Sequence, residues 1–198
     1  EGEATLTVER LGAIPHHAVL RPLARGKNFI LTDRQLRFDL DGPGHWVLEF
    51  DEDWGRPLYV FAEPMRVLNA PEVAGPLRRF AGGVWHRPAA VELEPRESLW
   101  LEPGAILEAP VRVRESSDVI LAGPGIILGS FQSPDGVRGI MEATRRPTLE
   151  VAESKGVTVR DLLVLDAAAW STVCLASRDV TFDNHKSISW NISDDGLD

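Results

Sequence analysis

Short runs in which hydrophobic and polar residues alternate fill the first third of the chain. They recur roughly every ten residues, with Gly, Pro, Asn and Asp between them. This spacing is typical of short antiparallel strands in a β-sandwich, where one face of each strand is buried. We therefore predict a β-sandwich-like domain over residues 1–70. The runs are "ATLTVERL", "NFILT", "LRFDL", "HWVLEF" and "PLYVFAE".

Residues 71–88, "PEVAGPLRRFAGGVWHRP", interrupt this alternation with three prolines and three glycines. Clusters of proline and glycine mark turns and linkers, because these residues do not continue regular strands. We interpret this stretch as a connector between two domains.

A weak internal repeat follows the connector. The heptapeptides "ESSDVIL", "ESKGVTV" and "ASRDVTF" begin at Glu115, Glu153 and Ala176, which are 38 and 23 residues apart. A weaker copy, "PRESLWL", begins at Pro95, 20 residues before Glu115. The repeat is therefore 20 to 23 residues long, and one unit carries an insertion of about 15 residues. We assign the insertion to Phe131–Pro147 and expect it to project as a loop.

A repeat of this length, with short strands and turns, is typical of a β-solenoid, in which each coil buries its apolar residues against its neighbours. The predicted fold class is all-β: the N-terminal β-sandwich-like domain precedes a right-handed parallel β-helix over residues 89–198. Residue 1 is not Met and no polar tail ends the chain, so we expect a fragment whose helix is truncated at the C-terminus. Strand alternation places Val157, Val159, Val180 and Phe182 inside, and Thr158 and Thr181 outside.

The composition argues against nucleic acids and membranes as binding partners. Acidic residues outnumber basic ones by 30 to 21, the net charge is -9, and no basic stripe is visible. We therefore predict no nucleic-acid partner. No run approaches the ~18 apolar residues of a membrane helix, so no membrane partner is predicted. The single cysteine, Cys174, excludes an internal disulfide, and we interpret it as a small buried hydrophobe.

The last eight residues, "NISDDGLD", suggest a site. The repeat predicts a strand near Ser187–Asn191 and then a turn into the next coil. Leu197 is predicted to point inward, which leaves Gly196 and Asp198 facing outward. Carboxylates gathered on the outer face of a β-helix can protonate and hydrolyse glycosidic bonds. An Asx-rich β-turn and a calcium-binding loop remain alternatives for this segment.

Three parts of the chain resemble a known family and its relatives. The sequence "DDGLD", Asp194–Asp198, resembles the Asn-Thr-Asp-Gly-x-Asp element of the polygalacturonase family of glycoside hydrolases (family 28, in the clan of dextranase and isopullulanase). Gly82–Ser130 is similar to the opening coils of that superfamily. The N-terminal part is similar to the β-sandwich that precedes the helix in dextranase-like and bacterial polygalacturonase-like proteins. One departure is that Ser193 stands where the family has Asn.

The resemblance implies an inverting glycosidase that hydrolyses O-glycosidic bonds in a cell-wall polysaccharide or an oligosaccharide, with no metal and no organic cofactor. Asp195 matches the family aspartate that helps to activate the attacking water. The general acid is expected beyond Asp198, so we expect this chain alone to have little activity. A secreted or periplasmic location is expected, with any signal peptide removed or upstream of Glu1. The expected substrate-binding residues are Asp194, Asp198, Asn191 and, as a sugar-stacking candidate beside the motif, Trp190.

Two other classes of function stay open. The family carries an Asp-Asp pair about one coil after the position of Asp195. A non-catalytic carbohydrate-binding β-helix, such as an adhesin or a tailspike-like protein, would lack that pair. A polysaccharide lyase would need a calcium-binding acidic cluster and a basic catalytic residue. For Trp85, Trp100 and Trp170 the interpretation is packing in the core or at the ends of coils, with sugar stacking as the alternative. We expect His185 and Lys186 to lie in a solvated turn.

Overall fold

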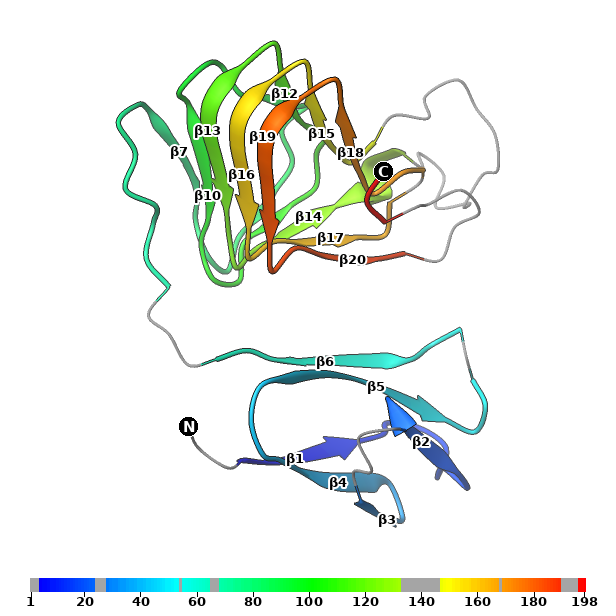
Figure 1. Cartoon of the computed structure of the whole chain (residues 1–198). Helices are drawn as coiled ribbons and strands as arrows, with labels where there is room; N and C mark the ends of the chain where they lie inside the picture. The colour runs from blue at the N-terminus through cyan, green and yellow to red at the C-terminus, as the bar shows by residue number, and fades with distance from the viewer. Residues whose placement is uncertain are drawn as a thin grey trace. The chain divides into compact units, whose positions relative to one another are not determined.

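The computed structural model describes residues 4–23, 28–53, 55–64, 68–132, 147–167, 169–189 and 196–198. Within these residues the regular structure is all β apart from short 3₁₀ segments such as η2 (Gly129–Gln132). The chain divides into two compact units, Glu1–Val67 and Leu68–Asp198 (Figure 1). No helix in the described part of the chain is long and apolar enough to cross a membrane.

The N-terminal unit consists of two three-stranded antiparallel sheets that share one core. The first has the order β1-β4-β3 and the second β2-β5-β6. Leu36 and Phe38 of β4 are buried between exposed neighbours, and Trp46 and Leu48 of β5 are buried in the same alternating way. This is the predicted β-sandwich-like arrangement. The strands are β1 (Ala4–Glu9), β2 (Ala18–Arg21), β3 (Phe29–Thr32), β4 (Gln35–Leu40), β5 (Gly44–Phe50) and β6 (Leu58–Ala62).

The C-terminal unit is a parallel β-helix in which each coil contributes strands to three parallel sheets (Figure 1). Sheet 1 contains β7 (Leu77–Phe80), β10 (Ser98–Leu101), β13 (Ser117–Ala122), β16 (Lys155–Arg160) and β19 (Arg178–Asp183). Sheet 2 contains β8 (Trp85–His86), β11 (Ile106–Leu107), β14 (Ile126–Leu128), β17 (Leu163–Leu165) and β20 (Lys186–Ile188). Sheet 3 contains β9 (Val91–Glu92), β12 (Val111–Arg114), β15 (Leu149–Ala152) and β18 (Thr172–Leu175).

The core of the helix follows the predicted alternation. Val157 of β16 pairs with Val180 of β19, and Val159 pairs with Phe182. Both β16 valines are fully buried, while Val180 and Phe182 are partly buried against the same core. Stacking equivalent apolar residues of successive coils removes them from water, which a single coil cannot do. The predicted all-β fold class with a parallel β-helix is confirmed.

The proposed connector over residues 71–88 is wrong in its extent. Strands β7 and β8 lie within it and pair in parallel with β10 and β11, so the helix begins at Leu77 rather than near residue 89. Gly82 and Gly83 lie at the corner between β7 and β8 rather than in a linker. A Cβ on Gly82 would come within 2.3 Å of the Pro103 carbonyl oxygen in the next coil, so only glycine permits this approach.

The weak repeat copy at Pro95 is also shifted from its predicted register. Leu99 of β10 pairs with Leu121 of β13, a spacing of 22 residues rather than 20. A shift of two residues preserves which side chains face the core, because the side-chain period of a strand is two residues. The error in register therefore does not change which side chains of the strand are predicted to face the core.

The insertion falls where the repeat predicts it. Residues 108–110 alone separate β11 from β12, whereas residues 129–148 separate β14 from β15 in the next coil. The extra length thus lies at the corner between sheet 2 and sheet 3. Most of the predicted loop, residues 133–146, lies outside the described residues, so its projection from the helix stays a prediction.

The serine of the heptapeptide repeat links successive coils. Ser154 Oγ accepts a hydrogen bond from the Ser116 N–H (3.1 Å) and donates one to the Ala152 carbonyl oxygen (2.7 Å). One coil further, Ser177 Oγ accepts from the Ser154 N–H (3.0 Å) and donates to the Leu175 carbonyl oxygen (2.8 Å). The repeat therefore encodes a corner as well as a strand. The residue before each serine has a left-handed backbone: Glu115 (φ 47°), Glu153 (φ 50°) and Ala176 (φ 48°).

Candidate functional site

Charged side chains gather on the outer face of sheet 3, where the strands of successive coils lie in register. Val111, Leu149 and Thr172 are fully buried in the interior column, so the residues next to them point outward. Arg114 and Ala152 form a second outward pair two positions along. The first outward column consists of Glu92, Arg112, Glu150 and Val173.

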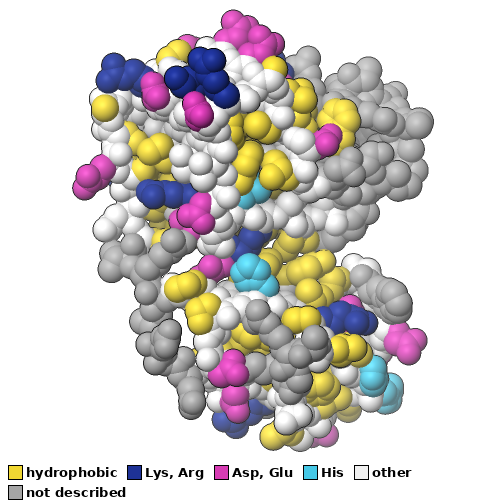
Figure 2. All heavy atoms as spheres, in the orientation of Figure 1, with side chains coloured by type: hydrophobic (Ala, Val, Ile, Leu, Met, Phe, Trp, Pro, Cys, Tyr) yellow, Lys and Arg dark blue, Asp and Glu magenta, His cyan; other side chains and the backbone are white. Residues whose placement is uncertain are grey.

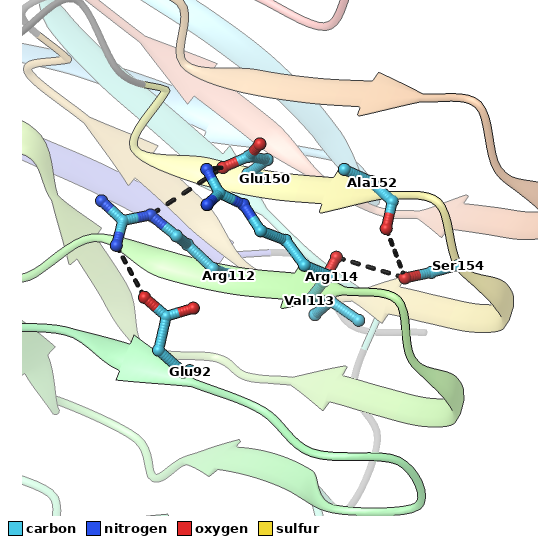
Figure 3. Close-up of polar contacts among 7 residues, drawn as sticks. All are labelled: Glu92, Arg112, Val113, Arg114, Glu150, Ala152 and Ser154. Atoms are coloured by element: carbon cyan, nitrogen blue, oxygen red, sulfur yellow. Dashed lines mark hydrogen bonds and ion pairs between the residues drawn. The ribbon is translucent and has the colours of Figure 1, made fainter.

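Ion pairs connect these charges across three coils (Figure 3). Arg112 Nη1 donates to Glu92 Oε1 at 2.6 Å, in the coil before it. Arg112 Nε lies 3.8 Å from Glu150 Oε2, in the coil after it. Arg114 Nη2 donates to the same Glu150 oxygen at 2.5 Å. We call Glu92, Arg112, Arg114 and Glu150 the charged ladder.

The members of the charged ladder differ in exposure. The side chains of Arg112 and Glu150 are each 11% exposed, whereas that of Arg114 is 46% exposed. The hydrogen bond to Glu150, and then the charges of Glu150 and Glu92, raise the pKa of Arg114 against the opposing effect of burial. A largely buried side chain stays charged only when it is paired, so the charges of Arg112 and Glu150 depend on their ion-pair partners. Arg114 is the ladder cation that solvent or a ligand can reach.

The chain returns to sheet 3 at its last residues. Leu197 forms a parallel bridge with Thr172 of β18. The Thr172 N–H donates to the Gly196 carbonyl oxygen and the Asp198 N–H donates to the Thr172 carbonyl oxygen, both at 3.1 Å. Leu197 is therefore in register with the interior column, and the exposed Asp198 falls in the outward column. Asp198 thus belongs to the same face as the charged ladder.

Four predicted site residues, Trp190, Asn191, Asp194 and Asp195, lie outside the described residues. Asp198 is the predicted site residue that the structure describes, and its role stays a prediction. No group of three or more His, Cys, Asp or Glu side chains in the described part of the chain is arranged to hold a metal ion.

A half-buried histidine contacts β18. His185 Nε2 and Thr172 Oγ1 are joined by a hydrogen bond of 2.9 Å, and the ring packs against Phe182 with centroids 5.7 Å apart. Burial, and to a smaller extent the charge of Lys186, lowers the pKa of His185 to about 4. The predicted solvated turn is therefore wrong for His185, because its ring packs against Phe182 and is hydrogen-bonded to the buried Thr172.

The charged ladder was not identified from the sequence, although a signal for it exists. Glu92, Arg112 and Glu150 stand 20 and 38 residues apart, which are also the spacings found for the repeat. Applying the repeat register to charged positions would have aligned them on one face. Their pairing distances depend on side-chain conformations that the register does not determine.

Comparisons with known proteins support the fold. No family model and no curated protein sequence matches the chain. Dex49A from Penicillium minioluteum is similar in structure, with a TM-score of 0.62 and 12% identity, over 94% of this chain and 45% of that one. A candidate glycosyl hydrolase from Parabacteroides merdae ATCC 43184 matches with a TM-score of 0.49 and 17% identity, over 58% of this chain and 61% of that one. The chain thus corresponds to less than two thirds of either neighbour's length.

Proposed function

We propose that this chain forms part of a glycoside hydrolase whose polysaccharide substrate lies along the outer face of sheet 3. One observation carries the proposal: the residues that follow "DDG" rejoin sheet 3, so that Asp198 extends the outward column of the charged ladder. Parallel strands ~4.8 Å apart present such a column as a straight row, on which a linear polymer can lie. The shared fold with Dex49A supports the scaffold.

The proposed reaction is inverting hydrolysis. One carboxylic acid protonates the leaving oxygen while a carboxylate activates water, and the two groups lie ~6.5–9.5 Å apart. We assign the activation of water to Asp195 with Asp198 as its neighbour, and protonation to a second acid that the described residues do not include. Glu150 is not assigned as this acid, because Arg114 and Arg112 both face its Oε2 atom.

A galacturonan is the proposed substrate. Arg114 is the accessible cation of the charged ladder, and a guanidinium suits the carboxylate of a uronic acid. A cell-wall polymer is met outside the cytoplasm, so the proposal includes a secreted or periplasmic location. Fractionation of the producing cells tests the location independently of activity.

The test uses the full glycoside hydrolase of which this chain is proposed to form part. It measures the release of reducing ends from polygalacturonate and from neutral polysaccharides. Asp195→Asn should lower turnover of polygalacturonate by about 10² to 10⁴-fold, because an amide cannot accept a proton from water. Asp183→Asn, an exposed aspartate of β19 on sheet 1, is the matched control and should keep the parent rate.

The products distinguish the alternatives. Turnover at the parent rate in Asp195→Asn would show that Asp195 is a turn residue. An unsaturated uronate product, detected by its ultraviolet absorbance, would identify a lyase. Binding of polygalacturonate without release of reducing ends would identify a non-catalytic carbohydrate-binding protein.

A further inference from the structure

Trp85 is an exposed aromatic side chain at the first coil of the β-helix. It lies on β8 and pairs with Ile106 of β11, while the neighbouring Leu107 is buried in the core. Trp85 therefore belongs to the outward row of sheet 2. It is 53% exposed, whereas Trp100 on sheet 1 is 4% exposed. Trp85 is therefore not packed in the core of the helix, which leaves coil-end packing and sugar stacking as its two interpretations.

Glu108, in the next coil, fixes the orientation of this ring. The Trp85 Nε1–H donates to Glu108 Oε2 at 3.0 Å, and Arg87 Nε lies 2.6 Å from the same oxygen. The Arg87 guanidinium lies over the Trp85 ring, 4.6 Å from its centroid. Ser130 Oγ donates to the other oxygen, Glu108 Oε1, at 3.2 Å. The Glu108 side chain is only 14% exposed, so the carboxylate is a held group rather than a free surface charge.

This arrangement presents a pre-oriented aromatic surface. Arg87 covers one face of the ring and Glu108 holds its Nε1 edge, so the exposed part of Trp85 lies on the opposite face and the benzene edge. The adjacent Val84 is also exposed and extends the apolar surface. A ligand that packs on this face binds without first ordering the ring, which lowers the entropic cost of binding.

We propose that Trp85 is the stacking residue of a carbohydrate-binding site separate from sheet 3, and that its ligand is a neutral pyranose unit of a polysaccharide. The C–H face of a pyranose is apolar and matches the exposed face of an indole, while hydroxyl groups at its rim can bond to Arg87 and Glu108. Glu108 neutralises Arg87, so the site has no net charge to select a uronate. The proposal does not depend on the function assigned to sheet 3.

The small size of the surface favours a sugar over a protein partner. A stable protein–protein interface buries about 800 Å² on each partner. The exposed apolar residues here are Trp85 and Val84, beside a paired arginine and carboxylate. One ring with polar groups at its edge is the scale of a single sugar unit.

Affinity gel electrophoresis of the full chain tests the site. The gels contain dextran, hydroxyethylcellulose, galactomannan or polygalacturonate. We expect at least one neutral polysaccharide to retard the protein and Trp85→Ala to weaken that binding by at least about tenfold. Trp170→Ala, which removes another exposed tryptophan, is the matched control and should bind as the parent does. Near-ultraviolet circular dichroism verifies that both variants are folded.

Oxidation of the unaltered protein by N-bromosuccinimide gives a second measurement that needs no variant. The retarding polysaccharide should protect Trp85 from oxidation, as mapped by peptide mass, and leave Trp170 reactive. The proposal would be overturned by unchanged binding in Trp85→Ala or by equal losses of binding in both tryptophan variants. It would also be overturned if Trp85 were oxidised at the same rate with and without the polysaccharide. Asp195→Asn should leave this binding intact, so failure of the hydrolase function does not affect the outcome.

Discussion

His185 gives the last described coil a stability that depends on pH. The ordinary pKa of histidine is 6.5, and burial lowers that of His185 to about 4 in the folded chain. Between these values the unfolded chain binds a proton that the folded chain does not. Stability therefore falls as the pH is lowered from about 6.5 to about 4 and then levels off. At about 1.4 kcal/mol per pH unit, the loss is at most about 3 kcal/mol.

Urea unfolding at about pH 7 and about pH 4.5 tests this dependence. His185→Leu should be less stable than the parent near pH 7, because Thr172 Oγ1 loses its partner, but should lose less stability in acid. His16→Leu, which replaces an exposed histidine, is the control. If His185→Leu shows the parent's full loss in acid, another group is responsible.

Strand alternation predicts single residues well within strands and poorly at corners. It correctly placed Val157 inside and Thr158 outside, because successive strand residues point to opposite faces. His185 follows a strand end, where no such rule fixes the side chain. Burial of its ring depends on contact with Phe182 and a hydrogen bond to Thr172, two partners that the local sequence does not identify.

At the scale of elements, the serine corners should contribute measurably to stability. Ser154→Ala removes the acceptor of the Ser116 N–H and the donor to the Ala152 carbonyl oxygen, both at a buried corner. The Ala152 carbonyl oxygen keeps the Glu115 N–H as a donor, but the Ser116 N–H loses its acceptor, and leaving a buried group unpaired costs about 1–3 kcal/mol. We expect a corresponding decrease in the free energy of unfolding, measured by urea denaturation at neutral pH.

Ser187→Ala is the control for this substitution, because Ser187 is an exposed residue of β20 on the same helix. It should change the free energy of unfolding by no more than about 0.5 kcal/mol. Equal effects of the two substitutions would show that the corner hydrogen bonds do not stabilise the coils. The repeat identified these serines as a pattern, but their role became clear only from the stacking of one coil on the next.

Very short elements set the limit of prediction at this scale. Strand β8 contains only Trp85 and His86, which is too short for alternation to show. It forms a strand because β11 of the next coil supplies its pairing partners. Local sequence therefore predicted a connector where pairing between coils builds the first turn of the helix.

At the scale of the whole molecule, the change from an irregular strand pattern to a repeat predicts two architectures in one chain. The structure divides between Val67 and Leu68. On the visible face of the helix, basic side chains lie beside acidic ones rather than in a continuous stripe (Figure 2). The spacing of the repeat predicts the order of the coils. The charged ladder could be recognised only once the side-chain positions of three coils were known. Sites assembled from several coils are therefore less predictable than the helix that holds them.

Two shortened chains test where the helix begins. A chain that starts at Leu68 keeps β7 and β8, whereas one that starts at Ala89 lacks both. Without them β10 and β11 become edge strands, and the core loses its contact with Phe80. We expect the shorter chain to unfold at a lower urea concentration and to aggregate more readily, because unpaired strand edges recruit other chains.

The two chains also separate two ways of protecting the first coil. If the chain starting at Leu68 remains soluble, β7 and β8 suffice to complete the edge. If it aggregates as readily as the chain starting at Ala89, the edge of β7 and β8 itself requires a cover. Equal unfolding midpoints for the two would contradict the assignment of the first coil to Leu77, because removal of a paired and packed coil must lower the stability of the strands stacked on it.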